Sequence, residues 1–452
     1  MGAGKSRLGP EIAQRLGRPF VDVDREIEDR HGAIADLFRE RGEPAFREIE
    51  VEVVGDVCAR REPVVVAVGG GAVETRGLLD RTDTFVVHLD VDVGTAWDRV
   101  RGSERPLAQD EAEFRRRYER RRPLYAEAAH AVARDADDVV LAAAGIDVGV
   151  GALELLASAV PAGDVSLVTD PHVAGIHGAT AQLALGERLQ STHELPPGEA
   201  AKAPDVAERL WRDLRLDRRG TLVALGGGSV TDVAGFVAAT YLRGIAWVAV
   251  PTTLVGQVDA AIGGKTALDL PEGKNLVGAF HWPAATVIDP ALLQTLPERE
   301  RREGMAEVVK TGLLAGEPLW ELPDVDLVRR CAAFKAAVSL RDPFDRGERA
   351  MLNLGHTFAH ALEAAGGYEQ VTHGSAVALG LLAALRLSGR PTDVVERTLG
   401  PTPVRVDRER AWAALQRDKK RGLVLLADDG PRVDVRLPEA EVRAALDTLI
   451  AD

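Results

Sequence analysis

The sequence reads LVALGGGS over residues 222–229, an apolar run that enters three consecutive glycines, and Asp232 follows within one helical turn. A short apolar run that ends in glycine predicts a buried strand of a parallel sheet, which here turns directly into a helix. Glycines at such a turn let a pyrophosphate approach the backbone and the helix N-terminus. A bare triple glycine is also common as a purely structural turn, so the surrounding residues must decide between the two interpretations.

The sequence that follows this turn is rich in hydrogen-bond donors and cationic side chains. The chain reads Pro-Thr-Thr-Leu at 251–254, Gln-Val-Asp at 257–259, Gly-Gly-Lys-Thr at 263–266 and Gly-Lys-Asn at 273–275. Packing alone does not account for so dense a series of hydroxyl, amide and ammonium groups. The region therefore indicates a ligand-binding site rather than a structural turn.

Candidate metal ligands lie further along the chain, past Leu293, where the pattern becomes mostly helical. Glu307 and Lys310 are three residues apart, His356 and His360 are four apart, and His373 follows. These spacings place each pair on one face of a helix. A lone histidine is more often a satisfied core residue, but one glutamate with two histidines is an ordinary catalytic Zn²⁺ set with an open coordination position. The sequence therefore predicts a metal site.

A second candidate site lies at the N-terminus, where residues 2–6 read Gly-Ala-Gly-Lys-Ser. This looks like the end of a phosphate-binding loop, whose backbone N–H groups hold phosphates while Lys reaches the phosphates and Ser holds Mg²⁺. On its own the short motif is equally well explained as an ordinary loop. Further on come Phe-Val-Asp-Val-Asp at 20–24, Phe-Arg-Glu at 46–48, a triple glycine at 69–71, Arg-Pro-Leu at 105–107 and Arg-Arg-Pro-Leu-Tyr at 121–125. The basic run 115–122 alone would be a solvated helix face.

Length and composition indicate a globular protein of more than one domain. With 452 residues, 46% hydrophobic and 28% charged residues, the chain is long enough for two or three globular domains. A net charge of −14 disfavours nucleic-acid binding, and no apolar run is long enough to span a membrane. Two cysteines without metal spacing predict no disulfide scaffold, and we expect a cytoplasmic protein.

In order and spacing, the N-terminal motifs resemble shikimate kinase over residues 1–136. The resemblance implies a P-loop kinase-like parallel-sheet domain that binds ATP, Mg²⁺ and shikimate. The ATP and Mg²⁺ residues would be Gly4, Lys5, Ser6 and Arg105, with Ser6 as the metal ligand. The shikimate residues would be Asp24, Arg47, Gly70 and Arg121.

Three departures set this domain apart from the family pattern. The strand and first glycine that normally precede the phosphate loop are missing, the segment between Trp97 and Arg105 is short, and a strand-like stretch at 136–150 replaces the expected terminal helix. Without its central strand the domain would expose backbone groups and part of its core. We expect the coding sequence to begin upstream of Met1; the alternative is an inactive relic.

Residues 137–452 resemble 3-dehydroquinate synthase. The resemblance implies an α/β NAD-binding part at 137–295 and a mostly helical metal- and substrate-binding part at 296–452. NAD would be bound by Asp170, Glu199, Lys202, Gly227, Gly228, Asp232, Thr252, Thr253 and Lys274. The ligands of Zn²⁺ or Co²⁺ would be Glu307, His356 and His373. Catalytic and substrate-binding residues would be Asp259, Lys265, Asn275, Lys310, Lys335, Asp345, Arg349, Asn353 and His360.

The implied reaction converts 3-deoxy-D-arabino-heptulosonate 7-phosphate to 3-dehydroquinate and phosphate, and NAD is reduced and reoxidised within one turnover. Asp345 and Ser375 stand where the family usually has Glu, and neither change removes a metal ligand. The resemblance also implies a homodimer. Three alternatives stay open: another sugar-phosphate cyclase, a metal-dependent polyol dehydrogenase of the same fold, and a scaffold with decayed sites, which suits the kinase half better.

Overall fold

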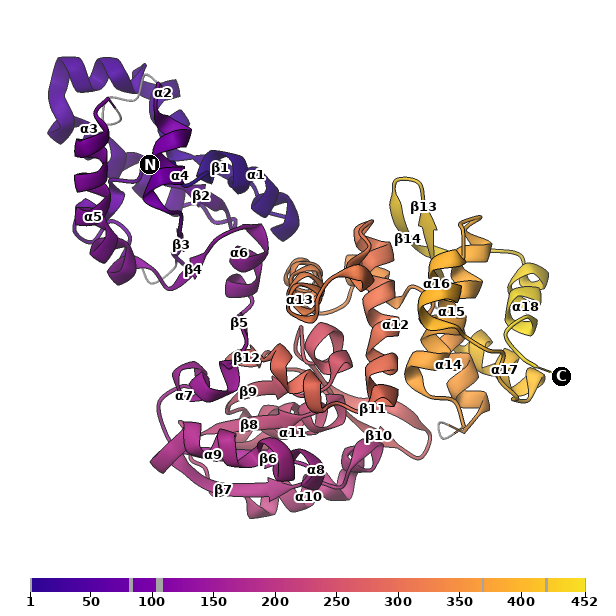
Figure 1. Cartoon of the computed structure of the whole chain (residues 1–452). Helices are drawn as coiled ribbons and strands as arrows, with labels where there is room; N and C mark the ends of the chain where they lie inside the picture. Colours follow the sequence, from indigo (N-terminus) through magenta and orange to yellow (C-terminus); the bar gives the residue numbers. More distant parts are fainter. Residues whose placement is uncertain (1, 81–83, 103–108, 368–369, 419–421, 452) are drawn as a thin grey trace. The chain divides into compact units, whose positions relative to one another are not determined.

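The computed structural model describes residues 2–80, 84–102, 109–367, 370–418 and 422–451, and the chain divides into two compact units, Met1–Ala144 and Gly145–Asp452 (Figure 1). The division falls later than residue 136, because α6 (Ala136–Ala143) packs against α1 (Lys5–Leu16) and β4 (Ala131–Ala133) of the first unit. The prediction of a strand-like stretch at 136–150 is therefore wrong over the first half of that range. Asp135 caps α6 by accepting from the Asp138 N–H at 3.0 Å, and only Ile146–Val148 form a strand, β5.

The first unit contains two separate pairs of parallel strands. β1 (Phe20–Asp22) pairs with β2 (Val65–Ala67), and β3 (Val87–Leu89) pairs with β4. Within the described residues no strand joins β2 to β3. The remaining helices are α2 (Val23–His31), α3 (Ile34–Cys58), α4 (Val93–Val100) and α5 (Glu111–Ala128). Helix α3 bends at Gly42, where φ is 77°.

A six-stranded parallel sheet forms the first half of the second unit, in the order β5-β12-β9-β8-β6-β7. Its further strands are β6 (Val165–Thr169), β7 (Leu189–Glu194), β8 (Thr221–Gly226), β9 (Ala246–Pro251) and β12 (Ala285–Ile288). Every residue of β6 and β8 is buried, as expected for strands covered on both faces. This confirms the buried strand predicted from the apolar run that begins at Leu222.

Helices cover both faces of this sheet (Figure 1). α10 (Pro204–Asp213) and α11 (Gly228–Thr240) share one apolar core with β8, and α7 (Leu156–Ala159) and α9 (Ala179–Leu185) share another on the opposite face. The short helix α8 (Pro171–Val173) follows β6, and an antiparallel hairpin of β10 (Lys265–Leu270) and β11 (Gly273–Phe280) extends from the sheet toward the helical half.

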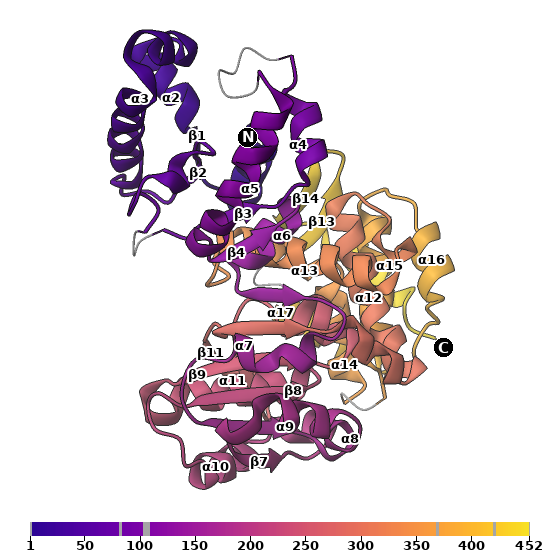
Figure 2. The same cartoon turned by 60° about the vertical axis from the view of Figure 1, so that its left-hand side comes forward.

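The second half of this unit is mostly helical, as predicted. Figures 1 and 2 show α12, α14 and α15 packed side by side, and they share one apolar core. Its elements are α12 (Glu298–Ala315), α13 (Asp324–Arg341), α14 (His356–Ala365), α15 (His373–Leu387), α16 (Asp393–Leu399), α17 (Arg408–Asp418), β13 (Leu423–Ala427), β14 (Gly430–Val435) and α18 (Glu439–Asp447). Over the described residues, no helix combines the length and apolar character that a bilayer crossing requires.

Candidate active site

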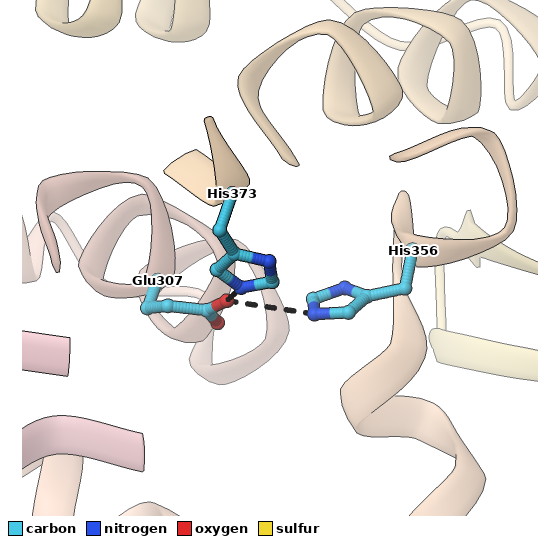
Figure 3. A group of neighbouring side chains, drawn as sticks. All are labelled: Glu307, His356 and His373. Atoms are coloured by element: carbon cyan, nitrogen blue, oxygen red, sulfur yellow. Dashed lines mark hydrogen bonds and ion pairs between the residues drawn. The ribbon is translucent and has the colours of Figure 1, made fainter. Parts of the chain in front are cut away.

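Three helices bring Glu307, His356 and His373 together (Figure 3). Glu307 lies on the buried face of α12, and each of α14 and α15 begins at a histidine. The Glu307 Oε1 atom is 2.9 Å from His373 Nε2 and 3.4 Å from His356 Nε2, and the three candidate ligand atoms lie within 4.8 Å of one another. The structure thus gathers the predicted metal ligands from three separate segments.

The chemistry of this donor set fits a divalent cation. Both histidines direct Nε2 toward Glu307, while their Nδ1 atoms face other acceptors: the Leu354 carbonyl at 3.3 Å from His356, and Glu363 Oε1 at 3.5 Å from His373. A neutral imidazole that donates its proton from Nδ1 has a lone pair on Nε2, and a metal ligand needs that lone pair. One carboxylate oxygen and two imidazole nitrogens at this spacing are a donor set of the kind that binds a divalent cation.

The cluster also attracts positive charge. Burial would raise the pKa of Glu307, but Lys310 and His356 outweigh it and hold that pKa well below its usual range. Burial would lower the pKa of His373, but hydrogen bonds to Glu307 and Glu363 overcome this and raise it to about 10. An imidazole retains a proton so strongly only where the surrounding electrostatic potential is strongly negative, and the same potential would stabilise a bound metal cation.

Buried ammonium groups stand next to the cluster. The Lys310 ammonium contacts Glu307 and lies 3.7 Å from Asp259 Oδ1, which also accepts from Lys335 Nζ at 2.6 Å. Burial lowers the pKa of Lys335 to about 8, although Asp259 opposes the shift. Asp259 therefore holds two cations in a buried position, where they can meet an anionic substrate.

Four more of the predicted substrate residues lie on other elements, and of these Arg349 is close enough to Lys335 to affect its charge. Arg349 is buried and donates from Nη1 to the Gly263 carbonyl at 2.9 Å. Lys265 donates to Asp345 Oδ2 at 2.7 Å, and Asp345 has the left-handed φ of 52°. Asn353 ends the 3₁₀ turn Glu348–Asn353, just before α14. The shorter side chain at Asp345 still reaches a cationic partner.

A cavity of about 1230 Å³ opens at the carboxyl ends of the strands. It is lined by all the residues that the sequence assigned to NAD: Asp170, Glu199, Lys202, Gly227, Gly228, Asp232, Thr252, Thr253 and Lys274. Asn275, His360 and His373 line the same cavity, so it reaches the metal cluster. Gly226 is required at the turn into α11, because a Cβ there would lie 2.7 Å from Val230.

A polar network organises the wall of this cavity. Lys202 is buried, and its ammonium donates to Asp232 at 2.7 Å and to Asn275. Burial raises the pKa of Asp232 to about 6, although Lys202 opposes the shift. Lys274 lies 3.0 Å from Glu199. Asn275, predicted to contact substrate, is therefore placed in the network of the predicted NAD residues.

In the first unit, the phosphate-loop residues lie at the start of α1. Gly4 has the left-handed φ of 90° and precedes the helix, and Ser6 Oγ donates to Asp22 Oδ2 at 2.6 Å. Lys5, Gly70 and Arg121 line one cavity, whose wall includes both β3 and α5. Arg105 lies outside the described residues.

The predicted shikimate residues cluster around the triple glycine. A Cβ on Gly71 would lie 2.1 Å from Arg47 Nη2, and a Cβ on Gly69 would lie 3.3 Å from Asp24 Oδ1. These glycines therefore let Arg47 and Asp24 approach the backbone. Arg121 is buried, and its Nε donates to Glu74 at 3.0 Å.

Four acidic residues next to the two sites were not found from the sequence. Glu50 is fully buried against Arg47, and Glu74 binds Arg121. In the second unit the residues are Glu303 and Glu363, which contact the loop and the ring of His373. Helical spacing offered a signal, because Glu363 is seven residues after His356 and Glu303 is four before Glu307.

Comparison with known proteins identifies the family. The 3-dehydroquinate synthase of Bordetella pertussis is 41% identical over 341 residues, which cover 67% of this chain and 95% of that protein. The chain belongs to the 3-dehydroquinate synthase family. The models of the N-terminal and C-terminal parts of 3-dehydroquinate synthase match residues 192–303 and 304–421, and the shikimate kinase model matches residues 1–144. A shikimate kinase domain is thus fused in front of a synthase, as the sequence predicted.

Other relatives agree with the synthase assignment. The 3-dehydroquinate synthase of Symbiobacterium thermophilum is 45% identical over 287 residues, covering 56% of this chain and 80% of that protein. The 2-epi-5-epi-valiolone synthase of Streptomyces hygroscopicus, solved with NAD⁺ and Zn²⁺ bound, has a TM-score of 0.60 and 25% identity over 67% of this chain and 96% of its own. Glycerol dehydrogenase of Schizosaccharomyces pombe shares the fold alone, at 14% identity and a TM-score of 0.50 over 67% of this chain and 88% of its own.

Proposed function

We propose that the synthase unit converts 3-deoxy-D-arabino-heptulosonate 7-phosphate to 3-dehydroquinate and phosphate, with NAD and a divalent metal as cofactors. One observation carries the proposal: a carboxylate and two imidazoles gather where the cavity lined by the predicted NAD residues meets buried lysines. The named function of the relatives at 41% and 45% identity supports this substrate over that of other cyclases.

The metal would be held by Glu307, His356 and His373, and NAD by the residues that line the cavity. The valiolone synthase structure contains Zn²⁺, and a 2-deoxy-scyllo-inosose synthase of 24% identity was solved with Co²⁺, so both ions are candidates. When bound, such a metal polarises a hydroxyl or carbonyl group, and NAD accepts and returns a hydride.

The protein's own residues bind the anionic substrate and move protons. Lys310, Lys335 and Arg349 supply three buried cations for its carboxylate and phosphate groups. His360 lies one helical turn after His356, with ring centroids 5.6 Å apart, and lines the cavity. These positions support a role for His360 in exchanging a proton with a substrate near the metal cluster.

Phosphate release tests the proposal. The full-length protein, NAD and Co²⁺ or Zn²⁺ should release one phosphate per substrate without net accumulation of NADH, and chelation should stop the reaction. Net NADH would indicate a polyol dehydrogenase, and preference for a heptulose phosphate without a carboxylate would indicate another cyclase. Either result would overturn the proposal. Glu307→Gln should lose the activity, and Glu298→Gln, on the exposed face of the same helix, is its matched control and should keep it.

We also propose that the first unit phosphorylates shikimate with ATP and Mg²⁺. The match of the shikimate kinase model over residues 1–144 and the clustering of Arg47, Asp24 and Gly70 support it. ADP production that depends on shikimate tests this activity, and its absence in a protein whose synthase is active would leave the unit as a relic.

We further propose that the synthase unit forms a homodimer. Leu276 and Phe280 on β11 are 58% and 43% exposed, and a second copy packed on this strand would cover them. Analytical ultracentrifugation of the full chain tests the stoichiometry; a monomer at micromolar concentration would contradict it.

A further inference from the structure

Two carboxylates outside the metal cluster contact the surroundings of His373, Glu363 at its ring and Glu303 at its backbone. The Nε2 atom of His373 faces Glu307, while its Nδ1 faces Glu363 Oε1 at 3.5 Å. Glu363 lies on α14 and its side chain is only 7% exposed. A buried carboxylate is retained where it has a cationic or donating partner, and here that partner is the ring nitrogen opposite the one that faces the cluster.

The second carboxylate, Glu303, holds the backbone on which His373 stands. Its Oε1 accepts from the Thr372 hydroxyl at 2.7 Å, and its Oε2 accepts from the Gly374 N–H. Gly374 is the second residue of α15, whose first N–H groups have no partner within the helix. Glu303 therefore caps α15 from a neighbouring helix, and its negative charge suits the helix N-terminus.

The local sequence permits this cap. A Cβ on Gly374 would lie 2.5 Å from Glu303 Cα, so only glycine lets α12 approach the start of α15 so closely. The Ser375 and Thr372 hydroxyl oxygens lie 2.8 Å apart, and Ser375 stands where the family usually has Glu. A longer acidic side chain at 375 would bring a second negative charge toward Glu303, whereas serine adds none.

We propose that Glu363 and Glu303 are positioning residues for the metal ligand His373. Glu363 fixes the ring, because an Nδ1–H donated to a carboxylate sets both the tautomer and the orientation of Nε2. Glu303 fixes the backbone at the first turn of α15. Carboxylates that orient metal-bound histidines commonly affect metal affinity by about 10- to 100-fold. The inference rests on the metal site of the proposed function.

Metal affinity tests the inference without reference to turnover. Co²⁺ is titrated into metal-free full-length protein, and its visible absorption band reports the ligand geometry. Glu363→Ala should weaken Co²⁺ binding by about 10- to 100-fold and change the band. Glu363→Gln keeps an acceptor oxygen and should recover most of the affinity. Glu303→Ala should weaken binding by a smaller factor.

Controls separate positioning from charge and from folding. Glu298→Ala removes an equal charge from the exposed face of α12 and should leave the affinity and the band unchanged. The melting temperatures of the metal-free variants show whether each is folded. Wild-type affinity in Glu363→Ala, or equal losses in Glu363→Ala and Glu363→Gln, would overturn the inference alone. If the wild-type protein binds no Co²⁺, the proposed function fails with it.

Discussion

The buried ammonium of Lys335 predicts an alkaline limit to synthase activity. Its pKa is lowered to about 8 by burial, and it binds Asp259 at 2.6 Å. The lysine must be charged to bind an anionic substrate group, so its contribution is present below the folded pKa and is lost as pH rises through it. With a pKa of about 8, the charged fraction falls from about nine-tenths at pH 7 to about one-tenth at pH 9, and kcat/KM should fall about tenfold, or about 1.4 kcal/mol.

Lys335→Arg tests the origin of this limit. A guanidinium stays charged throughout the range, so the variant should lose the alkaline fall even if its kcat/KM is lower at every pH. Phosphate release at pH 7 to 9 with saturating NAD and metal gives the profile. Lys265→Arg, at a side chain 47% exposed, is the matched control and should keep the wild-type fall. A Lys335→Arg profile that falls as steeply as the wild type would refute the reasoning.

Three further perturbations address the metal, the substrate cations and the kinase half. Glu307→Gln should reduce bound metal, measured by elemental analysis, and lower phosphate release by about 100-fold or more, because it removes a charged ligand. Gly263→Ala should lower the free energy of unfolding in urea by at least about 1–2 kcal/mol, since φ is 93° and the new Cβ would lie 2.4 Å from Arg349 Nη2. Glu74→Ala should tighten shikimate binding roughly tenfold by calorimetry, because it frees Arg121 from an internal carboxylate.

Each of these predictions has its control. Gly389→Ala introduces a Cβ at a φ of 65° with nothing within 4 Å, so it measures backbone strain alone. If it costs as much as Gly263→Ala, the clash with Arg349 has no effect. For the metal site, undiminished metal content in Glu307→Gln would exclude this carboxylate as a ligand. Unchanged or weaker shikimate binding in Glu74→Ala would show that Glu74 supports the site instead of competing for it.

The sequence by itself determined the local elements and the residue types of both sites. A continuous apolar run predicted β8, because a strand covered on both faces is apolar along most of its length. The glycines at 226–228 and the Glu and His residues at helical spacing marked the cofactor and metal sites. A local signal was also misread at 136–150, where a strand-like stretch was expected although Asp135 caps a helix.

Only the tertiary structure decided which charges meet. Asp259 and Lys335 are 76 residues apart, and His373 meets Glu303 and Glu363 from two other helices. Spacing along the chain shows which side chains share a helix face, but the crossing of α12, α14 and α15 determines which of those faces touch. Burial then gives these contacts their strength, because a carboxylate and a cation removed from water affect each other's pKa far more than an exposed pair does.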